Sequence, residues 1–458
     1  MPSKMPGRVG VGEKIGYGAG DLAISLYLNF FSLYLLYFFV DVGGLAPVAV
    51  GTMMLVVKLF DAVSDPVMGV IADRTRSRWG RYRGYLLWGA IPFSLSGAAT
   101  FAAPDMSEQA TLVWAYVAYG FAMVTLTLVG VPYSALLAAI SPSAAERAST
   151  AAYRMVFQSL GGILVGVVGT TLVRQLGQGD EGLGIMLTMF CIAGVAIVSI
   201  LTAFGATKER VPPSDQKNDI RGDLVTLIRT ASWIAISAAA VTAPLAIASR
   251  ASSAIFFFKY VVQDSGEPVF LFLNRLGLFF TALALGQVIG IVAANLATRR
   301  FDKRTLVIVA GAIKGSALVL FYFLPLDAVW LQTFVQLLIG IGFGMLMILA
   351  YAMFTDVAEY VEWKSGRQMT ALVVSASIFA LKTGIAIGAA TPGIVMAATG
   401  FVANVDQAPQ ALFGINFAFT ILPALMLIPG VGAIYFYRID RKLLARLETE
   451  LELRRAKA

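Results

Sequence analysis

Twelve long apolar segments, separated by short polar connections, constrain the fold of this chain more than any other feature. A helix needs about 20 apolar residues to cross the hydrocarbon core of a bilayer, and each segment comes close to or exceeds that length. The sequence therefore predicts an all-α polytopic membrane protein with twelve transmembrane helices. The segments cover 15–40, 47–72, 85–103, 111–139, 150–172, 183–206, 232–261, 270–298, 305–324, 328–355, 369–399 and 410–437.

The composition agrees with a membrane protein and argues against a soluble one. Of the 458 residues, 58% are hydrophobic and 14% are charged, whereas an average soluble domain is roughly 25% charged. The first apolar run continues to Val40, which is too long for the apolar part of a cleaved signal. We expect an N-terminal six-helix bundle (1–207), a cytoplasmic central linker (208–230), a C-terminal six-helix bundle (231–437) and a helical cytoplasmic tail (438–458).

The distribution of basic residues predicts the orientation of the chain. Most of the 35 Lys and Arg side chains fall in the two tails, in the central linker and in alternate connections, including Arg74 to Arg83. The opposite connections carry mainly acids, such as Asp41, Asp105 and Asp180. Because basic connections stay on the cytoplasmic side, both termini are predicted to be cytoplasmic in a plasma-membrane protein.

Two residue types are scarce enough to exclude whole classes of chemistry. The chain has no histidine and one cysteine, Cys191. Histidine-based metal centres, Ser-His triads and imidazole proton relays are therefore excluded, as is an intramolecular disulfide. We interpret Cys191 as a small buried side chain. The composition does not favour an enzyme, no cofactor is expected, and carboxylates must carry any cation or proton.

An internal repeat supports a division into two halves. The second span ends in GVIADRTRSRWGRYR, and the second span of the other half ends in IVAANLATRRFDKR. A duplicated six-helix unit is typical of the major facilitator fold, in which two pseudo-symmetric bundles rock about a central site. Gly69, Asp73 and Arg74 also fit that superfamily's GxxxD(R/K) loop pattern, and we expect Asp73 to interact with a neighbouring helix N-terminus.

The segment KLFDAVSDP holds the densest group of charges inside a predicted span. Lys58, Asp61 and Asp65 fall on one helical face, and the two acids are one turn apart. Two carboxylates in a dry site cannot both ionise cheaply, so a shared cation or proton is expected. Oxygen ligands fit Na⁺ or a proton better than a transition metal. The alternative is a structural ion-pair network with Lys58 and Arg154.

A charge at the bilayer centre costs at least about 2.5–3.5 kcal/mol, so the other charged residues in or near the spans are also candidates for function. Asp21 lies in GYGAGDLAIS and is suited to accept hydrogen bonds from substrate hydroxyls. Arg154 and Lys382 are expected to connect the cation site to the substrate site, while Arg250 and Lys314 stay open between function and structure. A cytoplasmic gate or loop network is expected at Asp356, Glu359 and Glu362.

Several of these segments together resemble the glycoside–pentoside–hexuronide:cation symporters, a major facilitator family typified by melibiose permease. The resemblance is carried by KIGYGAGD, YFFVDVGGL, KLFDAVSDPVMGVIADRTRSRWGRYR, VGVPYSALLAAISPSAAERASTAAYRM, FTDVAEYVEWKSGRQ and the lysine of ALKTG. It implies a coupling-cation site at Asp61 and Asp65, assisted by Ser64 and Thr127. It also implies a substrate site that involves Asp21 and Arg154, with Lys382 nearby.

The sequence departs from melibiose permease at four positions. Gly130 stands where that permease has a second sugar-binding aspartate, and Gly20 stands in place of a lysine. Ser134 replaces a tryptophan that packs on the sugar, and Ser64 replaces an asparagine of the sodium site. These changes remove sugar contacts but retain the paired carboxylates. Sodium and proton coupling therefore both remain open, and a pocket with Gly130 suits a larger or more apolar substrate.

The function expected from these features is cation-coupled symport of a sugar or glycoside by alternating access. An alternative within the family is sodium-dependent transport of a lysophospholipid or another amphiphile, and an alternative from another class is a non-transporting membrane receptor or scaffold. The expected partners are a small-molecule substrate, a monovalent cation and membrane lipids, and no nucleic acid is expected to bind. The protein is predicted to be a monomer. Coupling or gating roles are predicted for Lys58, Asp73, Arg74, Asp356 and Glu359.

Overall fold

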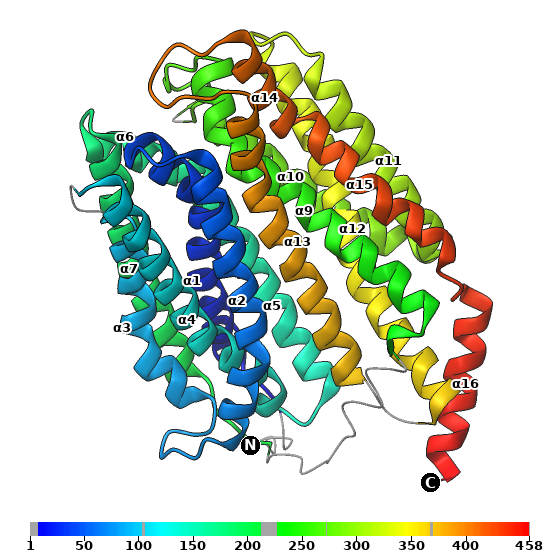
Figure 1. Ribbon diagram of the computed structural model, residues 1–458. Helices are drawn as coiled ribbons and strands as arrows, with labels where there is room; N and C mark the ends of the chain where they lie inside the picture. The colour runs from blue at the N-terminus through cyan, green and yellow to red at the C-terminus, as the bar shows by residue number, and fades with distance from the viewer. Residues whose placement is uncertain (1–7, 103–105, 212–226, 272, 367–369, 458) are drawn as a thin grey trace. The chain divides into compact units, whose positions relative to one another are not determined.

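A computed structural model describes residues 8–102, 106–211, 227–271, 273–366 and 370–457 (Figure 1). Asp105, Arg367 and the middle of the predicted linker, 212–226, lie outside the described residues. Within these ranges the regular structure is helical, apart from an isolated bridge between Phe270 and Leu273. The chain forms two compact units: unit 1 comprises 1–215, 264–280 and 402–406, and unit 2 comprises 216–263, 281–401 and 407–458.

Each of the twelve expected spans is a helix or a short run of helices. Eleven are long and apolar enough to cross a membrane; the remaining one, α3, is more polar because it contains Arg83, three serine and threonine residues and Pro92. The helices are α1 (Val11–Tyr37), α2 (Pro47–Arg74), α3 (Arg83–Thr100), α4 (Glu108–Ile140), α5 (Ala144–Leu164), α6 (Thr170–Gly177), α7 (Glu181–Ala206), α9 (Ala231–Phe256), α10 (Arg275–Ala297), α11 (Lys303–Tyr322), α12 (Val329–Ser365), α13 (Thr370–Ala398), α14 (Pro409–Phe419), α15 (Ile421–Ala433) and α16 (Arg441–Lys457).

In unit 1 the helix α1 is central. It packs against α5 and α7, while α3 packs on α4 and α7 and α2 packs on α4. Aromatic side chains fill the interior: Tyr27 stacks on Phe31 and Phe93, and Phe30 stacks on Tyr34. Burial of such rings is a large favourable contribution to packing. These rings pack α1 into the interior of unit 1, and this helix also carries Asp21.

In unit 2 small residues bring helices into close contact. The helix α9 packs against α13 and α15, and α11 packs against α12 and α15. Gly384 and Gly388 on α13 lie directly against the backbone carbonyls of Val241 and Leu245 on α9, which leaves no room for a Cβ. Small residues at crossings let membrane helices approach closely, because lipid supplies no hydrophobic force between them.

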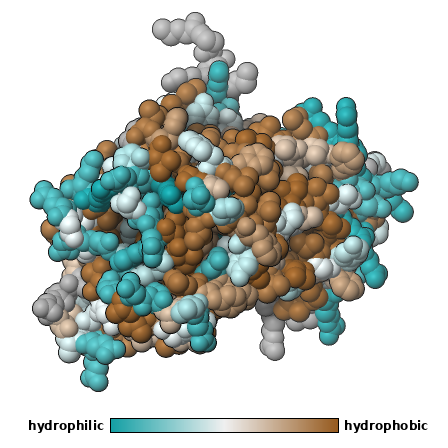
Figure 2. Space-filling model, turned by 90° about the horizontal axis from the view of Figure 1, so that it is seen from above, coloured by the Kyte–Doolittle hydropathy of each residue, from teal (hydrophilic) through white to brown (hydrophobic). Residues whose placement is uncertain are grey.

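Large apolar side chains cover much of the protein surface. Val117, Val198 and Ile428 are each more than 60% exposed, and Figure 2 shows extensive apolar areas beside hydrophilic patches on one face. Such exposure is expected where lipid takes the place of water. The prediction that Cys191 is buried was wrong: this residue is exposed on α7, because a side chain in an apolar run can face lipid as well as protein.

Candidate cation and substrate sites

The two aspartates of α2 meet at a single hydroxyl group from α4. Thr127 Oγ1 donates to Asp61 Oδ1 at 2.7 Å and lies 3.2 Å from Asp65 Oδ1. Asp61 is buried at 7% exposure, and Asp65 is half-buried. Three oxygen-bearing side chains therefore converge where α2 packs on α4, and oxygen ligands are those preferred by hard cations.

The neighbours of these aspartates on α2 contribute less to the cluster. Ser64 Oγ donates to the carbonyl of Asp61, one turn back in the same helix, at 2.9 Å. Lys58 is half-buried and one turn before Asp61. Among the described residues no group of three or more Asp, Glu, Cys or His side chains comes together. The geometry thus offers two carboxylates and a hydroxyl, a set suited to a monovalent cation or a proton.

Asp21 and Arg154 form an ion pair between α1 and α5. Arg154 Nε lies 3.2 Å from Asp21 Oδ1, with side-chain exposures of 28% and 3%. Asp21 Oδ2 is buried and has no hydrogen-bond partner among the described residues. A buried carboxylate oxygen without a partner carries a desolvation cost, so this oxygen is available to a ligand hydroxyl.

Two tyrosines form the wall beside this ion pair. The rings of Tyr17 and Tyr133 stack at 4.6 Å, and each hydroxyl donates to the backbone carbonyl of the other residue, at 3.0 and 2.7 Å. The Arg154 guanidinium lies over the Tyr133 ring at 5.1 Å, and its Nη2 is 3.4 Å from Ser134 Oγ. The guanidinium is therefore held by a carboxylate, a ring and a hydroxyl.

The two glycines that mark the departure from melibiose permease have opposite surroundings. A Cβ on Gly130 would approach only Ile24 Cδ1, at 4.0 Å. A Cβ on Gly20 would lie 2.5 Å from the Tyr133 ring. Space is therefore open at Gly130, whereas Gly20 is required for α1 to pack against Tyr133.

Three further predicted site residues, Lys382, Asp356 and Glu359, belong to unit 2. Lys382 is half-buried on α13, in unit 2, whereas Asp21 and Arg154 belong to unit 1. Asp356 on α12 accepts two 2.7 Å hydrogen bonds from Lys303 and one of 3.2 Å from the Tyr437 hydroxyl. Burial and this carboxylate raise the pKa of Tyr437. Glu359 is half-buried one turn after Asp356.

Asp73 does not occupy the helix N-terminus that we expected it to contact. Its carboxylate accepts from the Tyr82 hydroxyl at 2.7 Å and lies 3.5 Å from the Arg81 guanidinium. The acid at that N-terminus is Glu209, which accepts from the backbone N–H groups of Arg81, Tyr82 and Arg83 at 2.8–2.9 Å. Arg74 is exposed at the last position of α2.

Sequence reasoning missed three residues that shape these sites. No role was predicted for Tyr17 and Tyr133, because both lie in apolar helices. Their positions beside GAGD and within VGVPYSAL were the signal that could have indicated them. Glu209 follows the sixth span in a charged stretch, where no local pattern singles out one acid. Its partners lie more than 120 residues away in sequence, so only tertiary structure reveals its role.

Comparisons with known proteins give consistent results. Residues 16–441 match the family described as MFS/sugar transport protein. The chain is 31% identical to the isoprimeverose transporter of Lactiplantibacillus pentosus, with 95% of this chain and 91% of that protein covered. It is 32% identical to a putative glycoside/cation symporter, YagG, of Escherichia coli, with 90% and 89% covered.

Solved structures share the fold. The crystal structure of a D-xylose-proton symporter covers 93% of this chain and 95% of its own, with a TM-score of 0.65 and 13% identity. A bacterial homologue of the human lysosomal transporter Spinster, inward-facing and unoccupied, gives a TM-score of 0.69 at 15% identity, with 95% and 97% covered. Together with the family match, these likenesses show the twelve-helix major facilitator fold.

Proposed function

Because the chain belongs to the family of MFS/sugar transport proteins, and is therefore a multi-pass membrane transporter and not an enzyme, we propose that it is a cation-coupled symporter of a sugar or glycoside. The observation that carries the proposal is the convergence of Asp61, Asp65 and Thr127 on one point. Relatives named as symporters support it.

The cation binds between the two carboxylates and is either Na⁺ or a proton. The single Thr127 hydroxyl proton is donated to Asp61 Oδ1, and Asp65 Oδ1 lies 3.2 Å from the same oxygen; when a metal cation binds, this oxygen turns a lone pair to the ion. One positive charge relieves the repulsion between the acids, and so cation binding stabilises the local packing of α2 on α4. No cofactor enters this cycle.

The substrate binds beside Asp21 and Arg154. The available Oδ2 of Asp21 accepts from a substrate hydroxyl, and the Arg154 guanidinium donates to a ring or hydroxyl oxygen. The open space at Gly130 extends this pocket and favours a substrate with an apolar substituent, such as an aryl or alkyl glycoside. Lys382 on α13 is proposed to contribute to substrate binding, and Asp73, Arg74, Lys58, Asp356 and Glu359 to act in coupling or gating.

Uptake into proteoliposomes made with the purified full chain tests this function. An imposed inward Na⁺ or H⁺ gradient should drive accumulation of at least one labelled glycoside from a panel that also contains lysophospholipids. Asp61→Asn and Asp65→Asn should each abolish gradient-driven accumulation, because the site loses half of its charge. Gradient-driven accumulation by both variants at the wild-type level would contradict cation coupling at this site.

The matched control is Asp180→Asn, which changes an exposed aspartate at the start of α7 outside both sites. It should transport as the wild type does. Accumulation of a lysophospholipid, without accumulation of any glycoside, would overturn the proposed substrate class. It would not contradict the proposed cation site.

A further inference from the structure

The central helix of unit 1, α1, is exposed at one polar residue. Of the described residues from Gly16 to Tyr37, Asn29 alone is exposed, and the others are buried or half-buried. Asn29 lies near the middle of the membrane span Val11–Val42. An exposed amide at this depth would find no hydrogen-bond partner in lipid, and polar side chains inside spans therefore face the bundle interior or a water-filled cavity. Transporters bind their substrates near this depth.

The helices α1 and α5 pack side by side in a constant register. The ion pair of Asp21 with Arg154 joins residues 133 positions apart. One turn further along both helices, the Ser25 hydroxyl donates to the backbone carbonyl of Gln158 at 2.6 Å, again across 133 positions. Because the register is the same at two successive turns, the row that follows Asp21 on α1 faces the row that follows Arg154 on α5.

At the third turn Asn29 lies over a glycine of α5 in the same register. A Cβ on Gly162 would lie 3.7 Å from both Asn29 Nδ2 and Asn29 Oδ1. Asn29 follows Asp21 by eight residues, which is about 12 Å along the helix axis. The six residues that face each other at these three levels form the α1–α5 seam: Asp21, Ser25 and Asn29 on α1, and Arg154, Gln158 and Gly162 on α5.

The hydrogen bonds of Asn29 leave its amide oxygen available. Its Nδ2 donates to the carbonyl of Ser25 at 2.8 Å and to the Ser25 hydroxyl at 3.1 Å, which uses both amide protons. Among the described residues, no group donates to Asn29 Oδ1. Gln158 is also exposed near the middle of its own span, Ala145–Gly177, and its side chain has no partner in the described part of the chain. The seam thus offers two amides to a ligand that carries hydroxyl groups.

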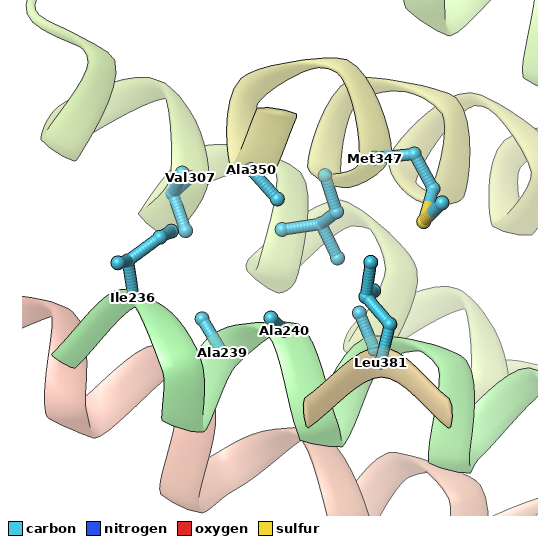
Figure 3. Close-up of a pocket in the computed structure, with 9 residues that line it drawn as sticks. Ile236, Ala239, Ala240, Val307, Met347, Ala350 and Leu381 are labelled. Carbon is cyan, nitrogen blue, oxygen red and sulfur yellow. The ribbon is translucent and has the colours of Figure 1, made fainter. Parts of the chain in front are cut away.

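A pocket in unit 2 has the opposite character (Figure 3). It lies between α9, α11, α12 and α13 and has about the size of a water molecule. All nine residues that line it are apolar, among them Ile236, Val307 and Met347. Such a space neither admits a sugar ring nor offers side-chain hydrogen bonds to its hydroxyl groups. The α1–α5 seam, in contrast, has the polar groups that a sugar requires.

We infer that Asn29 and Gln158 form a second binding subsite, which takes the second sugar unit of a disaccharide whose first unit binds Asp21 and Arg154. A single ring that is bound at the ion pair does not extend to an amide about 12 Å further along the helix, whereas two linked rings do. Asn29 Oδ1 accepts from a hydroxyl of the second ring. Gln158, one turn after Arg154, is placed to bond the hydroxyls near the linkage.

The inference rests on the proposed function and extends it, because it takes Asp21 and Arg154 as the site of the first sugar unit. The open space at Gly130 lies between α4 and α1, whereas the amides of Asn29 and Gln158 lie between α1 and α5. An apolar substituent beside Gly130 and a second sugar in the seam therefore do not compete for one space.

Thermal unfolding of the purified full chain in detergent tests the subsite, since a ligand that binds the folded state raises the melting temperature. Maltose, cellobiose, lactose and xylobiose are each titrated beside the methyl glycoside of their own non-reducing unit. At least one disaccharide should reach its half-maximal effect at a concentration about three- to tenfold lower than the matched methyl glycoside, because it forms a further hydrogen bond. The inference is wrong if none of the four pairs shows this advantage.

Asn29→Leu and Gln158→Leu locate the effect. Each change removes an amide from an exposed position, and each should abolish the advantage of the disaccharide while the methyl glycoside binds as it does to the wild type. Thr202→Val is the matched control, because Thr202 is an exposed polar residue of α7 whose hydroxyl bonds within its own helix. This control should keep the advantage. Loss of the advantage in neither leucine variant, or equal weakening of both ligands, would overturn the subsite.

Uptake into proteoliposomes separates a failure of the subsite from a failure of the proposed function. Gradient-driven accumulation of a methyl glycoside, when no disaccharide binds more tightly, would overturn the subsite alone. If no gradient drives accumulation of any glycoside, the proposed function is wrong and this inference fails with it.

Discussion

The hydroxyl of Thr127 is a neutral group that lies within hydrogen-bond distance of both paired carboxylates of unit 1. Thr127→Val keeps the shape of the side chain but removes this oxygen. A hydrogen bond to a charged group contributes about 1.5–3 kcal/mol, so the apparent affinity for the coupling cation should fall at least roughly tenfold. The measurement is the cation concentration that gives half-maximal uptake in proteoliposomes.

Thr125→Val provides the control for this change on the same helix. The Thr125 hydroxyl is buried and contacts Ser96 and the carbonyl of Ala122, without touching either aspartate. Thr125→Val should lower the stability of the protein but leave its apparent affinity for the cation near the wild-type value. Equal losses of cation affinity in the two variants would show that Thr127 has no specific role at the carboxylates.

Replacement by alanine is predicted to have opposite effects on stability at two helical glycines, Gly20 and Gly130. An exposed helical Gly→Ala change gains about 0.5–1 kcal/mol from backbone entropy. Gly130→Ala should therefore raise the melting temperature slightly, because its Cβ meets only Ile24 at 4.0 Å. Gly20→Ala should lower it, since the new methyl lies 2.5 Å from a Tyr133 ring that is fixed by stacking on Tyr17.

Substitutions at these two glycines also distinguish an effect on pocket size from an effect on folding stability. A larger side chain at the open position, Gly130→Val, should reduce transport of glycosides with bulky substituents more than that of small ones. An increase in melting temperature for Gly20→Ala would contradict the packing of α1 against Tyr133.

At the scale of single residues, the sequence indicated the charged residues of the candidate sites but not the groups that surround them. The spacing of Asp61 and Asp65 on one helical face predicted a shared site, and the structure places a common hydroxyl there. The Asp21–Arg154 pair joins residues 133 positions apart, so periodicity along one helix could not predict it; the family resemblance could. The stack of Tyr17 on Tyr133 was not predicted, because aromatic residues in apolar helices carry no pattern that distinguishes a site wall from a core.

At the scale of single elements, Glu209 is the cap of α3. Three backbone N–H groups at the helix start donate to its carboxylate, and such groups have no partner within the helix. Glu209→Gln keeps one acceptor oxygen but loses the charge that favours the helix N-terminus. We expect it to destabilise the protein by about 0.5–2 kcal/mol, measured as a lower melting temperature in detergent.

Glu108→Gln is the matched control for this cap. Glu108 is an exposed acid in the first turn of α4, and among the described residues no helix N–H donates to its carboxylate. Its replacement should change the melting temperature by much less. Equal effects of the two changes would show that charge near a helix start, and not the hydrogen bonds of Glu209, is what matters.

The helices themselves were predictable because apolar length is a property of sequence alone. Each predicted span contains a helix, yet the ends differ by several residues: α12 continues ten residues past the expected end at 355. Polar residues such as Asp356 remain helical there because Lys303 and Tyr437 satisfy the carboxylate. The end of a hydrophobic run is therefore not the end of a helix when tertiary partners are available.

At the scale of the whole molecule, the two compact units do not coincide with the two halves of the sequence. Residues 264–280 and 402–406 come from the second half but belong to unit 1. Arg174 on α6 donates to the carbonyl of Gly266 at 2.6 Å, and Asn404 donates to the carbonyl of Asp41 at 2.7 Å. The repeat in the sequence predicts two bundles of six helices, but it contains no information on such contacts between distant connections.

The charge distribution predicts how the molecule lies across the membrane, and that prediction can be tested with single cysteines. Cys191→Ser first removes the native thiol, and Arg76→Cys or Gln109→Cys then places one thiol in the connection before α3 or in the first turn of α4; both positions are exposed. In intact cells a membrane-impermeant maleimide should label Gln109→Cys, whereas Arg76→Cys should react only after permeabilisation. The physical reason is that several arginines near Arg76 favour the cytoplasmic side, while Glu108 and its neighbours add no positive charge. The reverse labelling pattern would show that both termini face outwards.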